Sequence, residues 1–153
     1  IRFYDAYIEK YKALHNLGEY EDAIIVINKA YSVFPDSLNL ILFRAVAKGA
    51  LGDKSEELKD LTKVIESKSL DSSNTAVAYR FRGLANIRYG AYKLAIKDLT
   101  NSIKFDDKNK LTYEDRANLY LKMKFTDSAC ADYRKAADLG LVRLYDAIDE
   151  NCK

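Results

Sequence analysis

The chain is poor in proline, glycine, histidine and tryptophan. Its 153 residues include one proline, six glycines, one histidine and no tryptophan. A sheet with many tight turns needs more glycine and proline, whereas long stretches rich in Ala, Leu, Lys, Glu and Asp favour helices. Because 153 residues is the length of one domain and 48% of them are hydrophobic, we expect a single all-α domain over residues 1–153.

A strong charge of one sign and a long hydrophobic run are also missing. The 25 basic and 23 acidic residues give a formal net charge of +2, and nucleic acids usually bind proteins with a clear basic excess. We therefore expect no nucleic acid partner. The longest apolar run, residues 23–27, is far shorter than the roughly 20 residues that span a bilayer, so we expect no membrane insertion of this domain.

The chain begins with Ile1 and not with Met, as a processed or shortened product does, so cytoplasmic and exported (periplasmic) locations both stay open.

Residues typical of catalytic and metal sites are scarce. His15 is the only ordinary base at neutral pH, and no nucleophile motif accompanies it. The sequence contains no glycine-rich phosphate loop, no HExxH, no EF-hand loop and no zinc-type cysteine spacing. We therefore expect no enzymatic activity, no metal ion and no cofactor.

What the chain does contain is an internal repeat. Residues 52–65 (GDKSEELKDLTKVI) align without gaps on residues 90–103 (GAYKLAIKDLTNSI), and the same frame matches residues 18–30 upstream and 124–136 downstream. In each unit the apolar residues recur at helical spacing in two blocks, which predicts an antiparallel helix pair. The units are approximately 4–37, 38–75, 76–109 and 110–141, with helices at about 3–16 and 20–33, 37–50 and 54–68, 75–88 and 92–104, 110–122 and 126–138, and a short capping helix at about 142–151.

The interval between the second and third units is four residues longer than the other two intervals. The extra residues lie near 68–74, and four residues make about one helical turn. Either the second helix of the second unit is one turn longer, or a serine-rich surface connection protrudes there and Asn74 or Thr75 caps the next helix.

The repeated residues resemble the tetratricopeptide repeat (TPR) family. The third unit matches the family pattern at Tyr79, Gly83, Gly90, Tyr92, Ala95, Leu99 and Ser102. The second unit departs most, with Lys54 and Glu57 at the positions of a turn Tyr and the first Ala. The resemblance implies an alpha-alpha superhelix, in which four helix pairs wind into a right-handed solenoid with a capping helix and the first helices form a concave groove. The C-terminal stretch is similar to the ends of many bacterial members of the family.

The resemblance implies a non-catalytic protein-interaction scaffold that binds a peptide or partner protein in this groove. Arg80 and Arg88 lie within residues 77–97, which contain five cations and no acid, and are candidates for binding an acidic or C-terminal carboxylate ligand. The alternative is a structural or assembly module that packs within a larger protein or self-associates. The residues that we expect in the groove are Ile8, Lys12, Asn16, Leu42, Val46, Arg80, Leu84, Ile87, Arg88, Asn118 and Lys122.

Some members of the family hold the C-terminal carboxylate of chaperones with a clamp of Lys and Asn on successive first helices. At the matching positions this chain has Ile8 and Lys12, then Phe43, then Val77 and Phe81. The clamp is therefore missing, and we do not expect chaperone tails as partners.

Three arginines of the first helices are each followed, at one constant spacing, by an aspartate of the second helix. These pairs are Arg44 with Asp60, Arg82 with Asp98, and Arg116 with Asp132. We hypothesise that each pair forms a structural ion pair between its two helices. The first unit lacks the pair, because Lys10 and Val26 occupy the two positions.

The two cysteines lie at the end of the chain. Packing of the final helix against the second helix of the fourth unit could bring Cys130 near Cys152. A disulfide and two buried free thiols both stay open for this pair.

Overall fold

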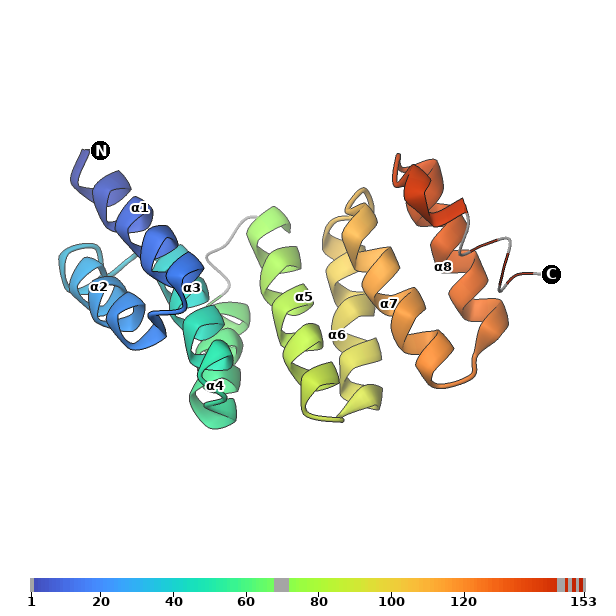
Figure 1. Ribbon diagram of the computed structural model, residues 1–153, viewed down its shortest axis with the longest axis horizontal. Coiled ribbons are helices and arrows are strands. Elements are labelled where there is room, and N and C mark those ends of the chain that lie inside the picture. The colour runs from blue at the N-terminus through green and yellow to red at the C-terminus, as the bar shows by residue number, and fades with distance from the viewer. Residues whose placement is uncertain (1, 68–71, 146–147, 149, 151, 153) are drawn as a thin grey trace. The chain divides into compact units, whose positions relative to one another are not determined.

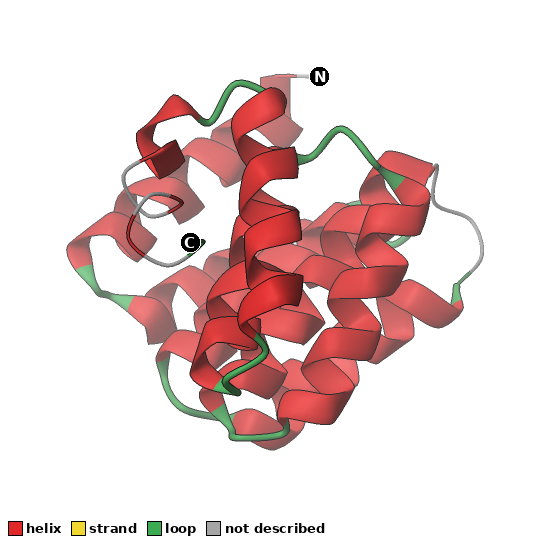
Figure 2. Ribbon diagram, turned by 90° about the vertical axis from the view of Figure 1, so that its right-hand side faces the viewer, coloured by secondary structure: helices red, strands yellow, loops and turns green. Residues whose placement is uncertain are grey.

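The structure is a computed structural model that describes residues 2–67, 72–145, 148, 150 and 152. Over these residues the chain is a series of helices joined by short loops, and Figure 2 shows no strand among them. The predicted all-α class is therefore confirmed. The helices are α1 (Arg2–Leu17), α2 (Tyr20–Val33), α3 (Leu38–Ala50), α4 (Lys54–Glu66), α5 (Ser72–Arg88), α6 (Tyr92–Phe105), α7 (Lys110–Lys122) and α8 (Thr126–Asp138), followed by the 3-10 helix η1 (Val142–Leu144).

The helices belong to two compact units, Ile1–Leu70 and Asp71–Lys153. The N-terminal unit contains α1 to α4 and the C-terminal unit contains α5 to α8 and η1 (Figure 1). Within each unit every helix packs against the next one along the chain, as stacked helix pairs do. The organisation of residues 1–153 as one domain stays a prediction.

The additional helical turn of the third repeat lies at the start of α5. The second helix of the second unit is not extended, since α4 ends at Glu66, and Asn74 and Thr75 do not cap α5, since α5 already begins at Ser72. The longer second helix and the cap at Asn74 or Thr75 are therefore wrong, whereas the protruding connection stays a prediction. α5 has 17 residues whereas the matching helix α7 has 13. Residues 68–71 lie outside the described residues.

The turn inside each helix pair needs one residue in the left-handed conformation. Gly18, Gly52 and Gly90 supply it with φ of 81°, 81° and 77°, and Lys124 supplies it in the fourth pair with φ of 65°. Glycine adopts this conformation without strain because it has no Cβ, whereas a lysine does so at a cost. The fourth turn nevertheless forms the usual closing hydrogen bond, in which the amide of Phe125 donates to the carbonyl of Tyr120 at 2.8 Å.

The first and second helices of a pair approach closely at small residues. A Cβ added to Gly83 of α5 would lie 2.9 Å from Leu99 Cγ of α6. Leu99 is completely buried, so its side chain has little room to move away. The small residue at this position of α5 therefore sets the distance between the two helices.

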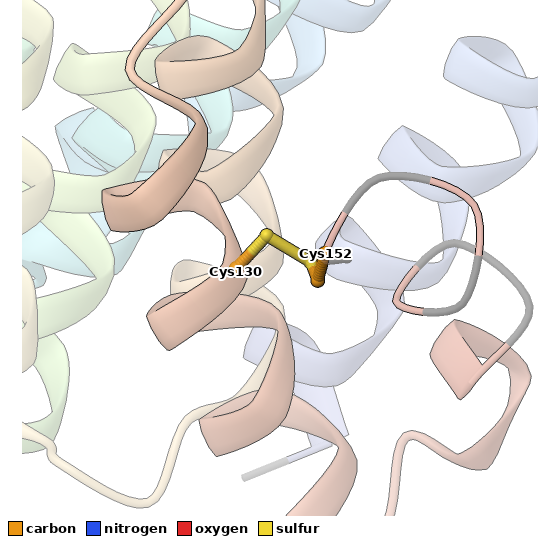
Figure 3. The surroundings of a disulfide bond; sticks show 2 residues. All are labelled: Cys130 and Cys152. Carbon is orange, nitrogen blue, oxygen red and sulfur yellow. A yellow bond between two sulfur atoms is a disulfide. The ribbon is translucent and has the colours of Figure 1, made fainter.

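The C-terminal segment covers α8, and its described residues between 142 and 150 are helical, as predicted for the capping helix. Its first described turn is the 3-10 helix η1, and residues 146–147, 149 and 151 lie outside the described residues. Leu141 and Leu144 are buried in a cluster with Tyr133 and Ala136 of α8. Figure 3 shows a disulfide between Cys130 of α8 and Cys152, so the segment is also covalently attached.

Candidate functional site

The structure brings together each of the three arginine–aspartate pairs. In every pair the arginine Nε and Nη2 donate to the two carboxylate oxygens of the aspartate, which is the two-point geometry that suits a guanidinium. The Nε and Nη2 distances are 2.8 and 2.7 Å for Arg44 with Asp60, 3.0 and 2.8 Å for Arg82 with Asp98, and 2.7 and 2.8 Å for Arg116 with Asp132. All three aspartates are buried. These residues therefore join helices inside the protein and are not available to a ligand.

Two of these arginines also bind the helix that precedes their own pair. Arg44 Nη1 donates to Asn28 Oδ1 of α2 at 2.9 Å, and Arg116 Nη1 donates to Thr100 Oγ1 of α6 at 2.9 Å. In both cases the acceptor lies 16 residues before the arginine, and the aspartate lies 16 residues after it. The sequence analysis did not predict this contact. A signal for it exists, because the polar residues Asn28, Thr62 and Thr100 recur at one position of the second helix in the first three units.

Asp60 shows how a buried carboxylate stays ionised. Burial alone would raise its pKa, but the hydrogen bonds from Arg44 and from Lys48, whose Nζ lies 3.0 Å from Oδ2, hold the pKa below its ordinary value. The group is thus charged at neutral pH and its charge is compensated inside the protein.

Two residues predicted for the groove belong to the interior. Ile8 and Leu42 are 9% and 6% exposed, so they cannot present a side chain to a ligand. Their place on a first helix predicts a groove position, but both side chains are buried. Among the other predicted groove residues of the N-terminal unit, Asn16 is exposed, Val46 is half-buried, and Lys12 is exposed and forms an ion pair with Glu9 at 2.7 Å.

Arg80 is engaged within the C-terminal unit. Its Nε donates to Asp115 Oδ2 of α7 at 2.6 Å, and both side chains are mostly buried. Burial raises the pKa of Asp115, and the nearby Arg80 guanidinium opposes this without cancelling it. The pair joins the two first helices α5 and α7, so the carboxylate that Arg80 binds in the structure is that of Asp115.

The remaining predicted residues of the C-terminal unit share the adjacent helices α5 and α7 (Figure 1). We call this set, together with Leu121, the α5–α7 surface, and it consists of Leu84, Ile87, Arg88, Asn118, Leu121 and Lys122. Its three aliphatic side chains are half-buried and the other three side chains are exposed. Lys122 Nζ lies 4.9 Å from the ring centre of Tyr92, and Asn118 Oδ1 accepts a 2.6 Å hydrogen bond from the Tyr133 hydroxyl. The surface thus combines half-buried apolar groups with exposed cations and with the side-chain amide of Asn118, which the Tyr133 hydroxyl holds in position.

No protein-family model and no curated protein matches the sequence, but solved structures match its fold. A crystal structure of the MamA protein shares 22% identity over 95% of this chain and 78% of that chain, with a TM-score of 0.72. The Cut9–Hcn1 hetero-tetramer of the APC/C shares 14% identity over 98% of this chain and 30% of that chain, with a TM-score of 0.81. YrrB, described as a TPR protein with an unusual peptide-binding site, shares 13% identity over 88% of this chain and 67% of that chain, with a TM-score of 0.64. The chain has the tetratricopeptide repeat fold.

Tyr11 and His15, the single histidine of the chain, are packing residues of the TPR fold. Tyr11 occupies the position where the family pattern has a small residue, and it is 4% exposed. Its hydroxyl donates to the carbonyl of Phe43 at 2.9 Å, and burial raises its pKa to about 12. His15 packs between the rings of Tyr11 and Tyr20, with ring centres 5.6 and 5.2 Å away. These contacts assign His15 to packing within the first repeat and Tyr11 to packing between the first and second repeats.

Membrane spans and metal clusters are both missing from the described part of this TPR fold. No helix in the described residues is long and apolar enough to cross a membrane. No group of three or more His, Cys, Asp or Glu side chains in the same residues is arranged to hold a metal ion.

Proposed function

We propose that this chain is a non-catalytic scaffold that binds an extended peptide or a helix of a partner protein on the α5–α7 surface. The observation that carries the proposal is the pattern on two neighbouring first helices. Leu84 and Ile87 of α5 and Leu121 of α7 are half-buried, and Arg88 and Lys122 are exposed beside them. Helical repeat arrays use their extended faces to bind partners, and aliphatic groups flanked by cations suit a ligand that is apolar and acidic.

The ion pair between Arg80 and Asp115 supports the same proposal in a different way. It fixes α5 against α7 at a 2.6 Å contact, so the aliphatic groups on the two helices keep their spacing before a ligand binds. Preorganisation of this kind lowers the entropy cost of binding.

A peptide-display selection tests the proposal. Wild-type protein and the variant Leu84→Asp/Arg88→Glu/Lys122→Glu are each used as bait for a library of random peptides, and affinities of the enriched peptides are measured by fluorescence anisotropy. We expect peptides rich in Asp, Glu and aliphatic residues, with binding weakened at least about tenfold by the variant, since each lost apolar or charged contact contributes on the order of 1 kcal/mol.

A matched control keeps the result specific to this surface. The variant Lys93→Glu/Leu94→Asp/Lys97→Glu makes the same change in charge and hydrophobicity on exposed positions of α6. It should bind the selected peptides like wild type, and both variants should match wild type in helical circular dichroism. Equal loss of binding in both variants, or no enriched peptides, would contradict the proposal.

The alternative, a module for assembly within a larger protein or with itself, predicts a different result. Peptides would then not be enriched, and the mass measured by light scattering would exceed that of one chain. The open face of α1 described below is an observation that fits association with another helix.

A further inference from the structure

The first helix has an apolar face that no described part of the chain covers. Phe3 and Leu17 on this face are 79% and 73% exposed, and Ala6, Lys10 and Ala13 between them are exposed as well. These five residues follow one another at intervals of three and four, which places them in one stripe along the whole helix. We call this stripe the open face of α1.

The matching face of later first helices is the place where the preceding second helix packs. Leu40 and Ala47 of α3 lie one repeat after Ala6 and Ala13, and both are completely buried in a cluster with residues of α2. In the C-terminal unit, Leu119 of α7 is 2% exposed and packs with Leu99 of α6. The open face of α1 therefore repeats an interface that α2 fills on α3 and that α6 fills on α7 within the described residues.

Lys10 indicates which charge a helix docked on the open face of α1 would carry. Its counterparts Arg44 and Arg116 each donate to a polar side chain of the preceding second helix and also bind an aspartate of their own pair. Lys10 has no such aspartate, because Val26 occupies that position. Within the described residues its ammonium group makes no ion pair or hydrogen bond. A helix that covers Lys10 must compensate a full positive charge, which a carboxylate does best.

Helix α8 of a second copy does not supply the carboxylate that Lys10 requires. Arg134 of α8 lies two residues after Asp132, at the position where α6 has Thr100, and it would place a second cation opposite Lys10. Leu141 and Leu144 also pack against Tyr133 and Ala136 of α8, so the C-terminal segment already occupies part of its surface. Head-to-tail stacking of copies through α8 and α1 is therefore disfavoured.

We propose that the open face of α1 docks an amphipathic helix of a partner protein that has aliphatic residues on either side of an Asp or Glu. The spacing is the one found on α6, where Thr100 accepts a hydrogen bond from Arg116 of α7 and Ile96 and Ile103 pack against clusters that contain α7 residues. The partner helix has its carboxylate at the position of Thr100, opposite Lys10. This surface is separate from the α5–α7 surface, and the proposal does not depend on the proposed function.

Two stapled helical peptides test the proposal directly. Both have the sequence of residues 91–106, and they differ only in carrying Thr100→Asp or Thr100→Lys. Binding to the whole protein is measured by isothermal titration calorimetry at low salt. We expect the Asp peptide to bind about tenfold more tightly than the Lys peptide, because a charge pair that is removed from water discriminates strongly against like charges. Equal affinities, or no binding of the Asp peptide, would overturn the proposal.

Variants of α1 locate the binding. Ala13→Arg adds bulk to the open face and should abolish binding, and Lys10→Glu should reverse the preference so that the Lys peptide binds more tightly. Lys12→Glu makes the same charge change on the polar side of α1 and should leave the preference for the Asp peptide in place. Circular dichroism checks that each variant is folded. Binding that survives Ala13→Arg, or a dimer in sedimentation velocity that Ala13→Arg dissociates, would overturn the proposal, the latter by assigning the face to a second copy.

Discussion

Arg116 joins three consecutive helices through one guanidinium group. Its Nε and Nη2 donate to Asp132 of α8 at 2.7 and 2.8 Å, and its Nη1 donates to Thr100 of α6 at 2.9 Å. The side chains of Arg116 and Asp132 are only 16% and 8% exposed. A shielded pair with two-point hydrogen bonding holds the register of the helices, and loss of one partner leaves the other charge buried.

We predict that the single variants Arg116→Leu and Asp132→Leu each lose about 3 kcal/mol of unfolding free energy, because each leaves one buried charge without its partner. The double variant should lose clearly less than the sum of the two. Urea unfolding of the four proteins gives the coupling energy. Strictly additive losses would contradict a direct pair.

Tyr11 should make the protein less stable at alkaline pH. Its pKa is raised from 10.0 to about 12 in the folded state, so the unfolded chain releases this proton first as the pH rises. The stability that the protonated hydroxyl contributes is complete below about pH 10 and is lost as the pH rises towards 12, by up to about 3 kcal/mol. In Tyr11→Phe this part of the alkaline loss should be missing. Melting temperatures of both proteins between pH 9 and pH 11.5 check this, and parallel curves would contradict it.

Lys124 is a site where a substitution should stabilise the protein. It has a φ of 65° at a turn where the other three repeats have glycine, and the left-handed conformation costs a residue with a Cβ about 1 kcal/mol. We expect Lys124→Gly to raise the unfolding free energy by about 1 kcal/mol. Lys124→Ala, which removes the charge but keeps the Cβ, should not do so. If the two variants change stability equally, the backbone conformation is not the cause.

The disulfide should hold the C-terminal segment against α8. Cys130 and Cys152 are 22 residues apart, and closing a loop of that length stabilises a folded chain by about 3 kcal/mol. Titration under denaturant without reductant should find no free thiols, and reduction should lower the melting temperature and speed amide exchange at Leu144. Two reactive thiols in protein prepared without reductant would contradict the assignment. The bond persists only in an oxidising compartment.

The helices were predictable because their signal is local. Apolar spacing and the internal repeat placed the first and second helices of each pair within a few residues of their observed bounds. The start of α5 was missed because Ser72, Ser73, Asn74 and Thr75 can all cap a helix, so the sequence does not determine at which of them the helix begins.

The candidate site was less predictable because it depends on contacts between helices. The Arg–Asp pairs repeat at one spacing and could be found for that reason. The pairing of Arg80 with Asp115 does not repeat in the sequence. Ile8 is buried because its side of α1 faces the neighbouring helices. The spacing of residues along a single helix does not show which side that is.

The most direct test of the scaffold proposal is an amide chemical-shift titration with a peptide selected on the wild-type protein. The account predicts the largest shift changes at Leu84, Ile87, Asn118 and Lys122, with little change at the exposed positions Lys93 and Lys97 of α6. Shift changes confined to α6 and α8, with α5 and α7 unaffected, would contradict binding on the α5–α7 surface.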